Sequence, residues 1–245
     1  MEQKLNRKTS QELARLYPAQ YVYYHYPDQP KSFVKEGIRW GKNDVISWEQ
    51  ILNHWNSKPR KTPIELMLAK MIHESGRKPY IAGYEKGQHE RNPDWKNFNE
   101  YQSTSYGLFQ VLGLVMDAYG FVPPDKENVF DYFTPDKQFD LFDKMMSDNI
   151  QKMKKLFPDA SDDEIIWHSI AHYGLPALYS KQNIQQTRNN YKQYRSGVKP
   201  QEKSIWDAIE KNFYTYKQLQ NLNEMYLKQF FKNETAQVIE VLKKK

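Results

Sequence analysis

The sequence contains no cysteine among its 245 residues. This absence excludes disulfides, cysteine-ligated zinc, iron–sulfur clusters and thiol nucleophiles, so packing alone must hold the fold together. No stretch approaches the roughly 20 apolar residues that a membrane-spanning helix needs, and we therefore expect no transmembrane segment. The first residues, Met1–Lys8, are charged and lead into no apolar segment. We expect a chain that is made in the cytoplasm without a Sec signal.

Aromatic residues are abundant, with 18 Tyr, 12 Phe and 6 Trp making up 15% of the chain. Chains that stay unfolded are poor in such residues. A length of 245 residues suffices for one sizeable core with a smaller appendage. The net charge of +6 favours an anionic partner, and a polyanionic cell wall and a membrane surface fit it equally well. Lys and Arg are spread along the chain, so we predict no nucleic-acid binding.

Helical patterns concentrate in the middle of the chain, where no βαβ pattern occurs. Thr62-Pro63-Ile64-Glu65 has the spacing of a capping box, and the apolar residues that follow recur at helical spacing. They predict a helix from about Pro63 to about Ser75, ended by Gly76. The polar residues 76–105 read as a long ordered loop. Caps and periodicity predict further helices at 111–119, from Thr134 onward, and from Ser161 to Gly174.

We therefore predict a mainly α fold in three regions. Residues 1–60 form an irregular N-terminal extension with a short strand or arm at 21–26, and residues 61–180 form the helical domain. Residues 181–245 form a polar linker and a long amphipathic helical segment, with apolar residues spaced by three or four. Because that apolar stripe keeps no strict seven-residue repeat, we expect it to dock on the main domain rather than form a coiled coil.

Glu74 breaks two local rules at the end of its predicted helix. It lies seven residues after Met67, within about 20° on a helical wheel, and so extends the apolar stripe. It also lies in the last turn, where the negative end of the helix macrodipole disfavours an acid. Such violations are expected at functional sites. The alternative is an ordinary glutamate that faces water at a frayed helix end.

A second motif follows the long loop: Ser105-Tyr106-Gly107-Leu108-Phe109-Gln110-Val111. Together with Glu74-Ser75 it resembles the lysozyme-like lytic transglycosylases and goose-type lysozymes. Their pattern is a helix ending in Glu-Ser, then a loop, then Gly-Leu-Met-Gln-Val, and here Phe109 takes the place of Met. Two weaker elements follow in the family's order. Residues 134–138 resemble its Asp-Pro-x-x-Asn-Ile helix start, and residues 171–174 resemble its Ala-Tyr-Asn-x-Gly segment.

The resemblance covers about residues 60–180 and implies a lysozyme-like domain that cleaves peptidoglycan. Glu74 would be the general acid at the β-1,4 bond between N-acetylmuramic acid and N-acetylglucosamine. In the lytic transglycosylases the same Glu then acts as base, and the C6 hydroxyl of N-acetylmuramic acid closes a 1,6-anhydro ring. We favour this activity because no single Asp stands out as a second carboxylate. The glycan strands of peptidoglycan are the expected partner.

Two alternatives remain open. A goose-type inverting muramidase would need a second carboxylate about 6.5–9.5 Å from the acid to position water. The candidates in the long loop are Glu85, Glu90, Asp94 and Glu100. A non-catalytic wall-binding or virion structural protein would keep the groove and bind peptidoglycan without cleaving it.

The resemblance also implies a set of substrate-binding residues beside Glu74. The Gly107 backbone and Gln110 would line the groove, and Tyr106 and Tyr173 would offer aromatic faces to sugar rings. Ser75 matches the family's Ser next to the catalytic Glu, and the alternative is that it only helps to end the helix. Both tyrosines are equally consistent with ordinary core packing.

We expect no cofactor and no metal. The His-Glu-x-x-His motif of zinc proteases would need a histidine at position 77, which is Arg77. His168 and His172 stand four residues apart and are able to share a zinc ion, but no third ligand is evident.

A wall-degrading enzyme without an export signal needs another route to its substrate. It would be carried in a phage particle, released through a holin-type pore, or loaded by a secretion machine. We favour a phage virion or lysis protein, with virion or secretion-machine components as further partners.

Overall fold

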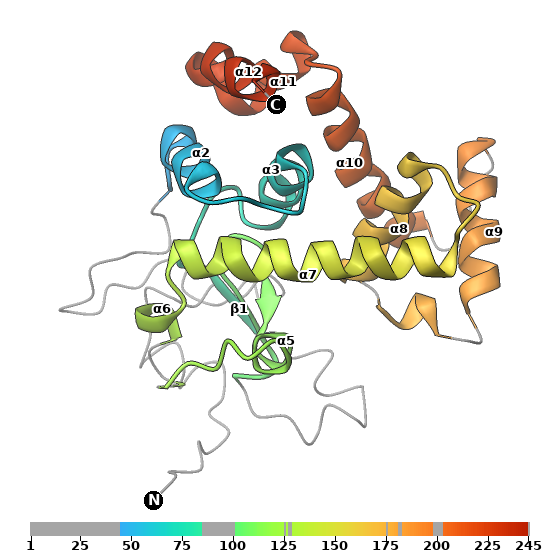
Figure 1. Cartoon of the computed structure of the whole chain (residues 1–245), viewed down its shortest axis with the longest axis horizontal. Coiled ribbons are helices and arrows are strands. Elements are labelled where there is room, and N and C mark those ends of the chain that lie inside the picture. Colours follow the sequence, from blue (N-terminus) through green and yellow to red (C-terminus); the bar gives the residue numbers. More distant parts are fainter. Residues whose placement is uncertain are drawn as a thin grey trace, which may run out of the picture. The chain divides into compact units, whose positions relative to one another are not determined.

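The protein is described by a computed structural model that covers residues 45–84, 101–124, 126, 129–174, 176–180, 183–197 and 203–244. The described chain is mainly helical, which confirms the predicted class (Figure 1). It forms two compact units: the first comprises Met1–Ser57 and Met71–Leu141, the second Lys58–Lys70 and Phe142–Lys245. Helices α3 (Ile64–Glu74) and α7 (Pro135–Leu156) contribute residues to both units. Within these described ranges, no helix combines the length and apolar character required to cross a membrane.

Helix α2 (Trp48–Asn56) belongs to the first unit and lies in the segment 1–60 that we predict to be irregular, so that prediction is wrong for these residues. Ser47 and Gln50 form a capping box, in which the Ser47 hydroxyl accepts from the Gln50 N–H at 3.1 Å. Four buried residues spaced by three or four drive its packing: Trp48, Ile51, Leu52 and Trp55. The predicted strand or arm at 21–26 lies outside the described residues.

The first unit also contains a three-stranded antiparallel sheet in the order β1-β2-β3. β1 (Ala82–Tyr84) pairs with β2 (Thr104–Tyr106) so that Ala82 lies opposite Tyr106, and β2 pairs with β3 (Val111–Leu112). We predict a loop over 76–105 and no strand at 111–112. The strands have two or three residues, too few for alternation to show in the sequence.

Two short helices, α5 (Gly113–Ala118) and α6 (Val129–Tyr132), complete the first unit with the start of α7. Gly113 packs directly on the backbone carbonyl of Tyr101, where an added Cβ would collide with it. Aromatic contacts fill the core: Phe139 of α7 makes edge contacts with Phe109 at 5.7 Å and Trp55 at 6.1 Å between ring centroids. The turn that carries Phe109 is thereby packed on α7.

The second unit contains helices from the C-terminal half of the chain: α8 (Asp162–Gly174), η2 (Pro176–Tyr179), α9 (Ile184–Arg195), α10 (Lys203–Gln220), α11 (Glu224–Phe231), η3 (Lys232–Glu234) and α12 (Thr235–Lys243). The end of α8 at Gly174 is as predicted. Helix α9 lies in the segment that we predict to be a polar linker. Its mean hydropathy is low and it buries only Thr187 and Tyr191 among its side chains, which explains why the spacing of apolar residues does not predict this helix.

The amphipathic segment that we predict from Ile205 to Phe230 is two helices. The helical conformation is interrupted between α10 and α11, where Leu222 adopts a φ of +51°. The Asn223 side chain then accepts from the Tyr226 N–H at 3.3 Å and caps α11. α10 packs on α8 through the stacked rings of Trp167 and Trp206, whose centroids lie 5.5 Å apart.

Candidate functional site

Glu74 is the last residue of α3, and the structure places it at a sharply defined helix end. The residues from Ile64 to Met71 are all buried, whereas Glu74 is half-buried. The Gly76 N–H donates to the Met71 carbonyl at 3.1 Å, and Gly76 and Arg77 both have left-handed φ values, +60° and +72°. The chain therefore turns away directly after Glu74, which leaves its carboxyl at the edge of a buried helix.

Ser75 brings a second polar group to the same helix end. The residue is 7% exposed, and its hydroxyl has no hydrogen-bond partner among the described residues. Its backbone N–H is satisfied by the Met71 carbonyl at 3.2 Å, so only the side chain lacks a partner. A buried hydroxyl without a partner costs about 1–3 kcal/mol, which calls for an explanation. A hydroxyl beside Glu74 that is reserved for a ligand would supply one.

The motif residues 107–110 form the tight turn between β2 and β3. Gly107 and Gln110 have φ values of +74° and +49°. The Gly107 N–H donates to the Ile81 carbonyl at 2.8 Å, and the Gln110 side-chain amide donates to the Gly107 carbonyl at 2.8 Å. Ile81 follows Glu74 by seven residues, so the segment that leaves α3 is bonded to this turn within the first unit.

Gln138 of α7 is the residue bonded to this turn that sequence reasoning misses. It is 1% exposed and makes three hydrogen bonds to backbone groups in this region. A signal for it did exist, because Gln138 occupies the Asn position of the helix-start motif that residues 134–138 resemble. A lone glutamine in a helix start nevertheless gives no sign of which backbone groups it will meet.

Tyr106 does not present an aromatic face to solvent. It is 1% exposed and packs between Tyr101 at 5.7 Å and Phe130 at 5.8 Å, measured between ring centroids. The expectation that Tyr106 stacks on a sugar ring is therefore wrong for this structure, in which Tyr106 is a core residue of β2. The central strand of the sheet buries all three of its residues, and this packing is invisible in so short a strand.

Tyr101 in the same cluster belongs to a polar network at α5. Its hydroxyl donates to Asp117 at 3.1 Å, and the Lys126 ammonium lies 4.0 Å from the Tyr101 ring centroid. Burial, and then the charge of Asp117, raise the pKa of Tyr101 well above its ordinary value. The hydroxyl therefore keeps its proton and acts as a hydrogen-bond donor that fixes α5.

Tyr173 belongs to the second unit, whereas Glu74 belongs to the first. It is half-buried, contacts Phe142 at 6.0 Å between ring centroids, and has the Lys70 ammonium 4.5 Å from its ring centroid. Lys70 is 3% exposed, so this cation–π contact is desolvated. The four predicted loop acids, Glu85, Glu90, Asp94 and Glu100, lie outside the described residues.

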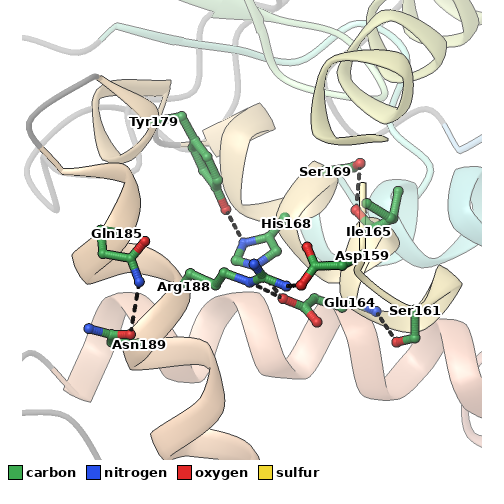
Figure 2. A network of polar contacts seen from close by, with 10 residues as sticks. All are labelled: Asp159, Ser161, Glu164, Ile165, His168, Ser169, Tyr179, Gln185, Arg188 and Asn189. Carbon is green, nitrogen blue, oxygen red and sulfur yellow. Dashed lines mark hydrogen bonds and ion pairs between the residues drawn. The ribbon is translucent and has the colours of Figure 1, made fainter. Parts of the chain in front are cut away.

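His168, one of the two histidines on α8, is the buried centre of a polar network in the second unit (Figure 2). His168 is fully buried, and its Nδ1 lies 2.8 Å from the Tyr179 hydroxyl. Its Nε2 faces Glu164 at 3.7 Å, while Arg188 binds Glu164 at 3.0 Å and Asp159 at 2.9 Å. The network joins α8 to η2 through the His168–Tyr179 hydrogen bond and α8 to α9 through the Glu164–Arg188 ion pair.

Burial, and then the charge of Arg188, lower the pKa of His168 to about 3. Burial, and then Lys152 at 2.7 Å from Nε2, lower the pKa of His172 to about 4. Both imidazoles are therefore neutral near pH 7. In the described parts of the chain, no group of three or more His, Cys, Asp or Glu side chains is placed to hold a metal ion.

Comparisons with protein-family models, with curated proteins and with solved structures found no significant match. The chemistry must therefore be argued from the residues themselves. A half-buried carboxyl such as that of Glu74 is a group that can transfer a proton to a polar ligand.

Proposed function

We propose that this chain is a peptidoglycan-cleaving glycosidase with Glu74 as its general acid. The observation that carries the proposal is the placement of Glu74 and Ser75 at the end of a buried helix whose outgoing chain is bonded to the Gly107–Gln110 turn. A lysozyme-like domain brings together the same motif types in the same order. The buried helix, the hydroxyl without a partner and the backbone bonds give a physical reason for Glu74, Ser75, Gly107 and Gln110.

Glu74 donates its proton to the glycosidic oxygen between N-acetylmuramic acid and N-acetylglucosamine, and the bond from that oxygen to C1 breaks. The C6 hydroxyl of the N-acetylmuramic acid then forms a bond to C1, and its proton returns to the Glu74 carboxylate. No water is consumed, and the product carries a 1,6-anhydro ring. This lytic transglycosylase reaction needs one carboxyl group that acts first as acid and then as base.

Ser75 and the turn would hold the glycan strand in this scheme. The Ser75 hydroxyl is buried and no described residue bonds it, so a substrate oxygen that reached it would complete its hydrogen bonding. Gly107 allows the chain to turn back beside Ile81, and the Gln110 side chain locks that turn. The net charge of +6 suits a polyanionic wall.

The test compares the wild-type chain with Glu74→Gln, which keeps the shape of the side chain and cannot donate the proton. We expect the wild-type chain to clear a suspension of purified cell walls and the variant to leave it turbid. Mass spectrometry of the released muropeptides identifies the reaction, because anhydro ends are one water lighter than the reducing ends that a hydrolase leaves. Clearing that survives in Glu74→Gln contradicts the proposal, and reducing ends alone contradict the transglycosylase assignment.

A further inference from the structure

Gln138 bonds three backbone segments through one buried side-chain amide. Its Oε1 accepts from the Leu108 N–H at 2.8 Å, and its Nε2 donates to the carbonyls of Pro79 at 2.9 Å and Phe133 at 2.8 Å. These segments are the chain that leaves α3, the turn between β2 and β3, and the residues that precede α7. All of them belong to the first unit.

Two of these three bonds connect the two parts of the candidate site, which are the chain that follows Glu74 and the Gly107–Gln110 turn. Pro79 follows Glu74 by five residues, and Leu108 lies between Gly107 and Gln110. The amide of Gln138 therefore sets the separation between the chain that emerges from the Glu74 helix end and the turn. The bond from the Gly107 N–H to the Ile81 carbonyl also joins them, and the Gln110 side-chain amide donates to the same carbonyl at 3.4 Å.

The chemistry of the position fits glutamine closely. It requires one acceptor and two donors on the same planar group, which an amide offers and a carboxylate, a hydroxyl or an apolar side chain does not. An added Cβ at Gly107 would collide with the Gln138 amide, so the turn approaches the amide as closely as a glycine allows. Because Gln138 is 1% exposed, water cannot replace these bonds.

We propose that Gln138 is a positioning residue, which holds the Gly107–Gln110 turn at the distance from Glu74 that the cleavage reaction requires. This inference rests on the proposed function. It assigns Gln138 no contact with substrate. Its effect is to keep a ligand bound by the turn in line with the carboxyl of Glu74, where a displacement of about 1 Å can cost about 100-fold in rate.

The experiment measures kcat and KM on solubilised glycan strands for the full-length wild type, Gln138→Met and Gln138→Asn. Methionine keeps the length of the side chain and removes all three bonds, whereas asparagine keeps the amide and shortens its reach. We expect kcat to fall about 10- to 100-fold in Gln138→Met with KM changed by less than about threefold, and Gln138→Asn to fall between that variant and the wild type.

Leu141→Ala is the matched control, since Leu141 is a fully buried apolar residue on the same helix and in the same unit. It lowers the melting temperature without removing a side-chain hydrogen bond. We expect its kcat to stay within about twofold of the wild type at a temperature where every variant is folded. Amide hydrogen exchange provides a readout that needs no activity: the Leu108 N–H should exchange faster in Gln138→Met and stay protected in Leu141→Ala.

The outcomes separate this inference from the proposed function. A folded Gln138→Met that keeps its kcat, or that raises KM alone, overturns the positioning role and leaves the proposed function standing. An equal loss of kcat in Leu141→Ala overturns it too, because stability alone would then explain the effect. Absence of cleavage by the wild type overturns the proposed function and the inference together.

Discussion

In the first unit, the buried amide of Gln138 bonds the chain that follows Glu74 and Ser75 to the turn between β2 and β3. In the second unit, the buried side chain of Glu164 faces the buried His168 on one side and binds the partly exposed Arg188 on the other. Both regions place a carboxyl on a buried helix. In the second unit an arginine neutralises that carboxyl, and aromatic rings surround the histidine.

The difference lies in how the polar groups around each carboxyl are bonded. The Glu164 network has charges of both signs within 3.0 Å, so it can hold α8 and α9 together without a ligand. At the Glu74 end, the backbone is firmly bonded while the Ser75 hydroxyl has no bond among the described residues. A rigid frame around an unsatisfied group is the arrangement that a binding site needs.

The largest expected effect contrasts the two carboxyls. Glu74→Gln should lower wall cleavage by about 100-fold to 10,000-fold, the usual range for loss of a general acid, with the free energy of unfolding unchanged within about 0.5 kcal/mol. Glu164→Gln should do the reverse and cost about 2 kcal/mol of stability, because Arg188 loses a charged partner in a largely buried site. Dye release from labelled walls and urea unfolding measure the two quantities.

If Glu164→Gln abolishes cleavage while the chain remains folded, the second unit has a catalytic part and the contrast between the units fails. Tyr179→Phe serves as the matched control for that variant. It removes a single hydroxyl from the same network and leaves both charges in place.

A smaller effect is expected from a pair of glycines with the same backbone conformation. Gly107 and Gly120 have φ values of +74° and +76°. An alanine at either position costs about 1 kcal/mol for the left-handed conformation. Gly107→Ala also collides with Gln138, so we expect a total of about 3 kcal/mol, whereas the Cβ of Gly120→Ala meets no described atom within 4 Å. Equal melting temperatures for the two variants would show that the turn does not pack on Gln138.

The next effect concerns acid stability in the second unit. The pKa of His168 lies at about 3 in the folded chain and at its ordinary 6.5 in the unfolded chain. As the pH falls below about 6.5, the unfolded state binds a proton that the folded state does not, so His168 lowers stability by up to about 1.4 kcal/mol per pH unit. This loss stops below the folded pKa, where both states carry the proton.

Urea unfolding between about pH 7 and about pH 4 measures this slope. In His168→Gln, the free energy of unfolding should depend less steeply on pH, by up to the contribution of one bound proton. Tyr179→Phe should keep most of the wild-type slope, because burial is the main cause of the lowered His168 pKa. An unchanged slope in His168→Gln would mean that other groups carry the acid sensitivity of this unit.

The smallest expected effect compares two buried serines. The Ser169 hydroxyl donates to the Ile165 carbonyl at 2.7 Å, so Ser169→Ala should cost about 0.5–1 kcal/mol and leave cleavage unchanged. Ser75→Ala removes a hydroxyl without a partner, so stability should stay level or rise, while the cleavage rate falls by about fivefold if the hydroxyl bonds the substrate. Thermal melting and initial rates distinguish the two, and a Ser75→Ala chain with full activity would remove Ser75 from the site.

Much of the helical framework could be predicted because its signals are local. The apolar spacing that leads to Glu74, the glycine at position 76 and the glycine at position 174 fix the ends of α3 and α8 within about a residue. Helix α2 escaped prediction although Ser47 and Gln50 carry a capping box, because a short amphipathic pattern was hidden among aromatic residues. Helix α9 escaped because most of its side chains are polar and exposed.

The sequence alone determined the helical class, the position of Glu74 at the end of a buried helix and the presence of the Gly107–Gln110 motif, since each depends on residues within one or two turns of one another. Only the tertiary structure decided that Tyr106 is a core residue, that the motif is a turn between two short strands, and that Gln138 bonds the turn to the chain beyond Glu74. These features depend on groups up to 59 residues apart along the chain. No local pattern specifies such contacts, because the free energy that selects them comes from burying both partners together.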